Sequence, residues 1–351
     1  MDASEFQKYL GGIYQNGLVM LSVALGHELG IFEFMISSNR SLHLSEIADS
    51  LDLKERYTKE WLSSMVAAGI ILQDRETNMY TLPESHHPAL KMAASFSPIM
   101  IVCSKRSDNL LKCFKKDGPY GISYQDSPEW FDWFDNYRST MCEIAVDTEI
   151  IPLLSQQDGV IPKLEKGIRV IDVGCGSGRF TNTLAKRFPN STFLGLDYSD
   201  KGIELSNQMK DSLGLKNVDF VQGDAHNLPD EYNESFDMVF VYDVLHDLPN
   251  PFKALEQIYK VLKPDGFFSL IEIGFHSNPI DNAGDKAAAM YYTCSMFICL
   301  ASSMTEPPHV GYGACWGVEE IEKALKGANF KLEGKSSLVI IGSKTFFFSM
   351  K

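Results

Sequence analysis

The sequence predicts an α/β protein that consists of a helical N-terminal module and a larger domain in which strands and helices alternate. Short apolar runs recur between residues 168 and 272, with segments of helical periodicity between several of them. A glycine cluster follows the first run. The expected strands are Ile168–Val173, Thr192–Asp197, Val218–Gln222, Phe236–Val241 and Phe267–Glu272, and the clearest helices are Thr181–Phe188 and Pro251–Leu262.

Length and composition indicate an ordinary globular protein. The 351 residues suggest about two domains. The chain is 44% apolar and 22% charged. Its first residues contain no basic segment that leads into an apolar core, so we expect no secretory signal and a cytoplasmic location. Polar residues interrupt the apolar segment 287–304, which predicts a buried helix and no membrane span.

Cysteine spacing and net charge exclude several classes of partner. The seven cysteines are scattered and form no C-x-x-C pair, which favours reduced thiols. The pair His27-Glu28 lacks the second histidine of a zinc-protease helix, and the other histidines are dispersed, so the sequence predicts no metal. The formal charge of −14 disfavours a nucleic-acid substrate. A small-molecule substrate suits this charge better.

The glycine cluster Gly174-Cys175-Gly176-Ser177-Gly178 is the strongest local signal. It lies between an expected strand and an expected helix, where glycines allow tight turns and close approach of a ligand to the backbone. Such a loop fits either the pyrophosphate of a dinucleotide or an amino-acid tail. Asp172 favours the second ligand, because a carboxylate repels pyrophosphate and can orient an ammonium group.

Two further acids follow the next expected strands. Asp197 ends its strand about twenty residues after the glycine loop, where a carboxylate can accept both hydroxyl protons of a ribose. Asp224 follows the third strand in a Gly-Asp pair and is placed to accept from an adenine amino group. Dinucleotide-binding folds do not require this third acid.

Together these motifs resemble the class I S-adenosylmethionine-dependent methyltransferases. The resemblance rests on D-V-G-C-G-S-G, Asp197, Gly223-Asp224-Ala225 and the later Leu262-Lys263-Pro264-Asp265-Gly266. It implies a seven-stranded, Rossmann-like sheet and S-adenosyl-L-methionine as the cofactor. The cofactor contacts that it implies are Asp172, Gly174, Cys175, Gly176, Asp197, Tyr198, Asp224, Ala225 and, on the methionine side, Asp243.

The first ninety residues predict a winged-helix module. A long apolar helix is expected over Leu18–Met35, followed by a short helix that begins at Ser45 and a longer helix capped by Asp52 and ended by Gly69. Ile70–Leu82 then predicts a hairpin. This order also fits a DNA-binding regulator, but acids nearly cancel the positive charge of the longer helix, and dimerisation fits better.

The module extends the resemblance to plant small-molecule O-methyltransferases, which place a winged-helix module before the catalytic domain and dimerise through it. A homodimer is therefore implied. The connector that follows is rich in aromatic residues, among them Trp130, Phe131 and Tyr137. It is expected either to cover the acceptor pocket or to pack between domains. Within it, Tyr120 and Tyr124 are candidate substrate-binding residues.

The acceptor chemistry is expected at the end of the fourth strand. Asp243 and His246 follow that strand, at the edge of an open α/β sheet where ligands bind. His246-Asp247 stands where the plant enzymes carry a His-Asp-Trp motif whose histidine is the catalytic base, with Leu248 in place of the tryptophan. A histidine in this loop can also be purely structural. Glu272, at the end of the fifth strand, either binds the acceptor or caps a loop.

We therefore expect a methyltransferase that acts on a hydroxyl or thiol of a small molecule. The expected divisions are a winged-helix dimerisation domain over 1–95, a helical connector over 96–160 and the cofactor-binding domain over 161–351. The alternatives are a DNA-binding regulator that senses the cofactor and a non-catalytic scaffold that binds it.

Overall fold

The computed structural model describes residues 1–124, 133–135, 142, 144–338 and 342–351. Contacts divide the chain into two compact units, Met1–Arg106 and Ser107–Lys351. The division falls inside helix α6 (Ile99–Cys113) and so within the expected connector, whose status as a separate domain stays a prediction. Trp130, Phe131 and Tyr137 lie outside the described residues.

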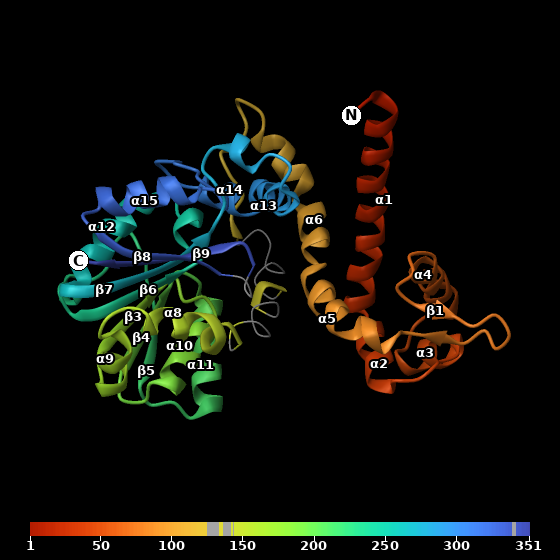
Figure 1. Ribbon diagram of the computed structural model, residues 1–351, viewed down its shortest axis with the longest axis horizontal. Helices are drawn as coiled ribbons and strands as arrows, with labels where there is room; N and C mark the ends of the chain where they lie inside the picture. Colours follow the sequence, from red (N-terminus) through yellow and green to blue (C-terminus); the bar gives the residue numbers. More distant parts are fainter. Residues whose placement is uncertain (125–132, 136–141, 143, 339–341) are drawn as a thin grey trace. The chain divides into compact units, whose positions relative to one another are not determined.

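The first unit has the winged-helix order of helices and a hairpin (Figure 1). Its core contains Trp61, which packs edge-on against Phe32 with ring centroids 5.1 Å apart and donates its indole N–H to the carbonyl of Ser22 at 2.7 Å. Gly26 permits this packing, because a Cβ there would lie 2.2 Å from the Trp61 ring. The elements are α1 (Ala3–Glu28), α2 (Ile31–Ser38), α3 (Leu44–Ser50), α4 (Glu55–Ala67), β1 (Leu72–Gln73), β2 (Tyr80–Thr81), η1 (Glu84–His86) and α5 (His87–Phe96).

Two predictions for this unit were wrong in detail. The single helix expected over Leu18–Met35 is two helices, because Gly30 takes a left-handed conformation (φ 69°) that ends α1 and starts α2. Asp52 does not cap α4. Its own φ is 53°, and Lys54 occupies the N-cap without a side-chain hydrogen bond. Local sequence signals located these helices and the end of α4 at Gly69, but missed the break at Gly30 and the residue that caps α4.

Among the residues that the structure describes, no single helix is long and apolar enough to cross a bilayer. The pair α1 and α2 would qualify on length and composition only if taken together, and the two helices meet at a bend of 68°.

The second unit is built on a seven-stranded sheet in the order β5-β4-β3-β6-β7-β9-β8. The strands from β3 to β7 run parallel, while β9 lies antiparallel to both β7 and β8. The predicted α/β fold is confirmed. The strands are β3 (Arg169–Val173), β4 (Thr192–Asp197), β5 (Val218–Gln222), β6 (Phe236–Tyr242), β7 (Leu262–Ile273), β8 (Lys331–Leu338) and β9 (Lys344–Met350).

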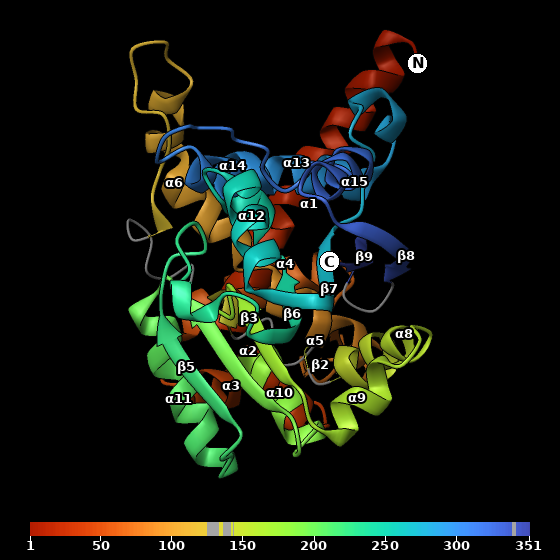
Figure 2. The ribbon, with the colours of Figure 1, turned by 90° about the vertical axis from the view of Figure 1, so that its left-hand side faces the viewer.

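Helices cover both faces of this sheet (Figures 1 and 2). Apolar residues of α8, α9 and α10 pack on one face against alternate strand residues such as Val170 and Phe240. Those of α12 and α15 pack on the other face against Ile171 and Val239. The helices of this unit are η3 (Val146–Ile150), α8 (Ile151–Ser155), α9 (Val160–Lys166), α10 (Arg179–Arg187), α11 (Asp200–Leu213), η4 (Asp230–Tyr232), η5 (Leu245–Asp247), α12 (Pro251–Val261), η6 (Pro279–Asn282), α13 (Lys286–Phe297), α14 (Cys299–Ser303) and α15 (Val318–Gly327).

The buried helix expected over residues 287–304 is broken in two. Ile298 has φ −128° and ψ −80°, which lies outside the helical region and separates α13 from α14. Cys299 is the first residue of α14. The break therefore sets the position of this thiol.

Candidate functional site

The glycine loop between β3 and α10 is tightly packed on one side. Gly174, Gly176 and Gly178 all have positive φ, at 83°, 56° and 67°. A Cβ on Gly174 would lie 2.5 Å from a methyl group of Val244, and one on Gly178 would lie 2.6 Å from the hydroxyl of Ser206. A Cβ on Gly176 would meet no atom within 4 Å. The loop thus leaves open space beside Gly176.

Asp172 ties the strand before the loop to the helix after it. The side chain is buried, and its Oδ2 accepts a hydrogen bond from the hydroxyl of Thr181 at 2.6 Å. Cys175, within the loop, is also buried, and burial together with the charges of Asp172 and Asp197 raises the pKa of its thiol well above the usual value. Cys175 is therefore a neutral side chain in the loop wall.

Asp197, at the end of β4, holds the loop from the neighbouring strand. Its Oδ2 accepts from the backbone N–H of Gly176 at 2.7 Å, and its Oδ1 accepts from the N–H of Ser199 at 2.8 Å. The structure therefore brings this predicted ribose ligand to the open part of the glycine loop. Tyr198 follows with 66% of its surface exposed.

Asp224 lies beyond the end of β5, the strand next to β4. Its carboxylate is about half exposed, and one oxygen accepts from the backbone N–H of His226 at 2.9 Å and contacts the His226 ring at 2.7 Å. Ala225, the next residue, is buried. Asp172 in β3, Asp197 in β4 and Asp224 just after β5 thus come from three adjacent parallel strands and lie near the same edge of the sheet.

Asp243, expected on the methionine side, forms an ion pair that the sequence did not predict. It follows β6 with φ 63°, and its Oδ2 binds the ammonium group of Lys344. Both side chains are nearly buried. Lys344 begins β9 and lies opposite Ile273 in the sheet register, so only the closing strand of the fold brings it to this edge.

His246 is anchored by Glu272, the penultimate residue of β7, which is the parallel neighbour of β6. The imidazole Nδ1 lies 2.5 Å from Glu272 Oε2, and the other carboxylate oxygen accepts from the backbone N–H of Leu245 at 2.8 Å. The side chains of His246 and Glu272 are 3% and 1% exposed. Glu272, a predicted substrate-binding residue, therefore orients His246 and is itself out of reach of solvent.

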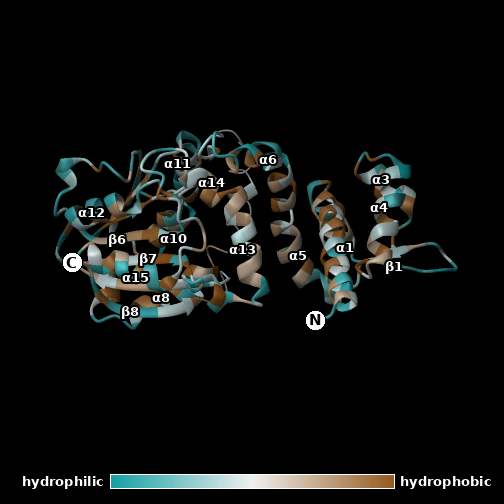
Figure 3. Cartoon of the chain, turned by 90° about the horizontal axis from the view of Figure 1, so that it is seen from above, coloured by the Kyte–Doolittle hydropathy of each residue, from teal (hydrophilic) through white to brown (hydrophobic). Residues whose placement is uncertain are grey.

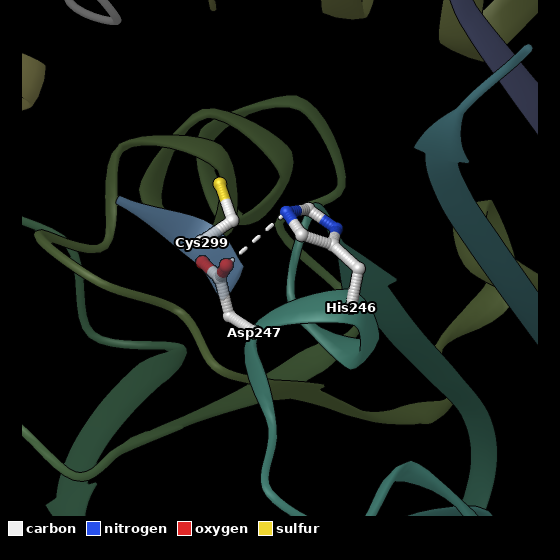
Figure 4. Close-up of side chains that lie close together, drawn as sticks. All are labelled: His246, Asp247 and Cys299. Carbon is white, nitrogen blue, oxygen red and sulfur yellow. Dashed lines mark ion pairs between the residues drawn. The ribbon is translucent and has the colours of Figure 1, made fainter. Parts of the chain in front are cut away.

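The other nitrogen of His246 faces Asp247 and Cys299 (Figure 4). His246 Nε2 lies 3.3 Å from Asp247 Oδ1, and the donor atoms of all three residues lie within 4.8 Å of one another. Tyr124 donates its hydroxyl to Asp247 Oδ2 at 2.8 Å. Tyr124, a predicted substrate-binding residue, thus belongs to the group around His246.

Burial and charge set the protonation of this group. Burial lowers the pKa of His246, but the charges of Glu272 and Asp247 outweigh it and hold that pKa well above the ordinary value. Burial raises the pKa of Cys299 to about 12, with a further contribution from Asp247. The pKa of Tyr124 is raised well above its usual value, again mainly by burial. The thiol and the phenol are therefore both neutral.

Tyr120, the other aromatic candidate, is not part of this group. Its ring is 66% exposed and stacks on His309, with centroids 4.1 Å apart and planes inclined by 5°. Sequence reasoning missed two further contacts. Cys299 lies beside His246, and Asp135 receives both Arg179, through two hydrogen bonds at 2.6 and 2.7 Å, and the hydroxyl of Ser177. No spacing pattern along the chain marks either contact.

Two family models match the chain. The model described as "Methyltransferase domain" matches residues 164–331, which include the glycine loop, the three acids near the strand ends and the members of the His246 group other than Tyr124. The model described as "Rv2258c-like winged HTH domain" matches residues 17–91 in the first unit. Residues 164–331 therefore carry a methyltransferase domain.

Curated relatives are similar to the methyltransferase domain over part of their length. A demethylmenaquinone methyltransferase of Lactobacillus johnsonii is 36% identical over 124 residues, which are 35% of this chain and 50% of the relative. A fatty-acid O-methyltransferase of Mycolicibacterium smegmatis is 31% identical over 156 residues, which are 44% and 48% of the two chains. The chain spans half or less of the length of these relatives.

Solved structures are similar over the whole chain. An O-methyltransferase family protein from Burkholderia thailandensis has a TM-score of 0.71 and 15% identity, and the likeness covers 100% of this chain and 98% of that one. Human N-acetylserotonin methyltransferase in complex with S-adenosylmethionine has a TM-score of 0.68 and 16% identity over 100% and 99% of the chains. At these identities the likeness shows a shared fold.

Proposed function

We propose that this protein is an S-adenosylmethionine-dependent methyltransferase that transfers a methyl group to a hydroxyl or thiol of a small molecule. The observation that carries the proposal is the placement of two groups at one edge of the sheet. The glycine loop and Asp197 follow β3 and β4, and the buried His246 group follows β6 and β7. A cofactor at the first group and an acceptor at the second would be neighbours.

The residues of the loop fit the cofactor. Gly176 leaves open space where a ligand can approach the backbone, while Gly174 packs against Val244 and Gly178 against Ser206. Asp197 stands at that space with lone pairs that can accept from a ribose, and Asp224 lies one strand further, on the side expected for adenine. When bound, the cofactor supplies a methyl group activated by its sulfonium. The chain's own contribution is to bind, align and exclude water.

His246 is the group best placed to handle the acceptor's proton. Glu272 holds its Nδ1, which fixes the ring so that Nε2 faces Asp247 and Cys299. A phenol, with a pKa of about 10, needs such help at neutral pH, whereas a thiol near 8.5 is already partly ionised. We therefore assign proton transfer to His246 and ring positioning to Glu272.

The proposal is tested by titrating the purified chain with S-adenosylmethionine in a calorimeter, with NAD as the comparison, and then assaying phenols, thiols and amines. We expect binding of the sulfonium nucleoside alone, and turnover on phenols or thiols. Uptake of NAD in its place would refute the cofactor assignment. Cofactor binding without turnover on any acceptor would favour the non-catalytic scaffold.

Replacement of the histidine tests its role in the reaction. His246→Ala should reduce phenol methylation by about 10²- to 10⁴-fold and affect thiol methylation much less. Equal retention of both activities would remove His246 from the chemistry. Ser295→Ala, in helix α13 outside the group, serves as the control for effects of a buried substitution.

We also propose that the first unit forms a homodimer through α1. This helix exposes many large apolar side chains, and its C-terminal half is largely hydrophobic (Figure 3). Contiguous exposed apolar side chains often mark a surface that binds another protein. A nucleic-acid partner fits less well, because Arg56 on α4 is paired with Glu60 at 2.5 Å.

Light scattering tests the dimer. We expect the wild type to be dimeric and the double variant Leu10→Asp with Tyr14→Asp to be monomeric. A control with Lys8→Asp and Gln15→Asp, at exposed positions of the same helix, should remain dimeric. A monomeric wild-type chain would refute this assembly.

A further inference from the structure

His246, Asp247 and Cys299 place a nitrogen, an oxygen and a sulfur donor around one point. Their donor atoms lie within 4.8 Å of one another, although η5 and α14 are distant in the sequence (Figure 4). This mixed donor set is typical of zinc and differs from the oxygen-only sites of calcium and magnesium. We propose that these three side chains form a binding site for a zinc-type divalent cation.

The spacing of the donors favours a metal over a direct ion pair. His246 Nε2 and Asp247 Oδ1 are 3.3 Å apart. A charge-assisted hydrogen bond would bring such atoms to about 2.7–2.9 Å. Two ligands of a tetrahedral zinc, each about 2.0–2.2 Å from the ion, are separated by about 3.3 Å. The observed distance matches the edge of a zinc tetrahedron.

Each of two ligands has an outer partner of the kind that metal sites use. Glu272 accepts from His246 Nδ1 at 2.5 Å and is itself held by the N–H of Leu245, so the ring is fixed with Nε2 turned into the site. Tyr124 donates to Asp247 Oδ2 and leaves Oδ1 facing the histidine. A carboxylate, a histidine and an open metal position in this order are the common way to orient a metal-binding imidazole.

The local charge also favours a cation. Asp247 and Glu272 bring two carboxylates to the buried His246 ring. Asp243, the next acid, forms an ion pair with Lys344, so it adds no net negative charge to the site. One imidazole therefore faces two carboxylates where water is scarce, and a divalent ion would balance the excess negative charge.

The proposal deepens the proposed methyl transfer and rests on it for its chemical role. Three protein ligands leave a fourth tetrahedral position, as in catalytic zinc sites. With zinc bound, His246 Nε2 would be a ligand and could not act as the base, so an acceptor hydroxyl or thiol in that position would lose its proton to bulk water, because a bound cation lowers its pKa. Its freed electron pair then forms the bond to the methyl carbon, while the methyl–sulfonium bond breaks and leaves its pair on the cofactor sulfur.

The test measures metal directly. The full-length chain is stripped with a chelator, dialysed against Zn²⁺, and assayed for bound metal and for affinity by chelator competition. We expect one zinc per chain. Cys299→Ser should weaken binding by about 100-fold or more, since removal of an outer partner alone costs about 10- to 100-fold. Cys294→Ser, a partly buried thiol on the neighbouring helix α13, should bind as tightly as the wild type.

Cobalt substitution gives a second readout. The Co²⁺ form of the wild type and of Cys294→Ser should show a sulfur-to-cobalt charge-transfer absorption that Cys299→Ser lacks. If Cys299→Ser fails to fold, Asp247→Asn takes its place in the affinity measurement. A wild-type chain that retains no zinc, or equal affinities for the wild type and Cys299→Ser, would overturn the site.

Failure of the metal site and failure of the proposed function are distinguishable. Calorimetry of the stripped chain measures S-adenosylmethionine binding without any metal. A chain that binds the cofactor and methylates acceptors but takes up no zinc overturns the metal site alone. A chain that binds zinc through Cys299 but ignores the cofactor supports the site and overturns its role in methyl transfer.

Discussion

The glycine loop and the His246 group lie at the same edge of one sheet and are built in opposite ways. The loop joins β3 to α10 within a few residues, and its geometry depends on left-handed glycines and one carboxylate from the adjacent strand. The His246 group combines side chains from residue 124 to residue 299. The geometry of the proposed cofactor side is therefore encoded locally, whereas that of the proposed acceptor side depends on long-range packing.

The largest expected change in stability concerns Glu272 and His246, the buried pair of the His246 group. Glu272→Ala should lower the free energy of unfolding by about 3–5 kcal/mol, because it leaves His246 and the N–H of Leu245 without their buried acceptor. Urea denaturation measures the change. Glu319→Ala removes a similar histidine contact, to His276 at 2.7 Å, from the surface and should cost about 0–1 kcal/mol. Similar losses in both variants would contradict the importance of burial.

The next effect concerns the local geometry of the loop. Gly174→Ala should cost about 2–5 kcal/mol, from a left-handed alanine and from overlap with Val244. Gly176→Ala has only the left-handed strain and should cost about 1–2 kcal/mol. Denaturation curves of the two variants give the comparison. If Gly176→Ala proved the more damaging to stability, the loop would be packed differently from the observed structure.

A third variant tests how the loop and the adjacent strand act together. Asp197→Asn should weaken S-adenosylmethionine binding by about 10- to 100-fold, because the hydrogen bonds of a charged acceptor are worth about 1.5–3 kcal/mol. Calorimetry provides the affinity. Asp200→Asn, at the exposed start of α11, is the matched control and should bind almost normally. Unchanged affinity in Asp197→Asn would separate this carboxylate from the ligand.

The smallest expected effect is a pH dependence of stability, which arises from the exposed pair of Glu319 and His276. Burial raises the pKa of Glu319, but hydrogen bonds from His276 and Ser277 outweigh it and lower that pKa from 4.5 to about 2. The folded carboxyl thus holds its proton less tightly than the unfolded one. Its stabilising contribution is present above 4.5 and is lost as the pH falls towards about 2. The Tm difference between wild type and Glu319→Gln should shrink over that range. A constant difference would refute it.

Individual residues show where sequence reasoning succeeded and where it failed. The apolar runs ending at Val173, Asp197 and Gln222 are adjacent parallel strands, as their pattern predicted. Gly30 and Ile298 broke helices that periodicity alone had joined, because one backbone angle ends a helix whatever the apolar pattern. Glu272 was expected to bind the acceptor or to cap a loop. It holds both Leu245 and His246.

The amino-acid order alone was enough to predict the alternating strands and helices, the glycine loop and the acids near the strand ends. Those features depend on neighbours within a few residues, where alternation, turn geometry and strand ends are visible. It did not predict that Cys299 lies beside His246, because the two residues are far apart along the chain and follow no recognisable spacing. Only the folding of α14 over η5 brings the thiol to the imidazole, since distant donors meet through packing of the core and not through spacing along the chain.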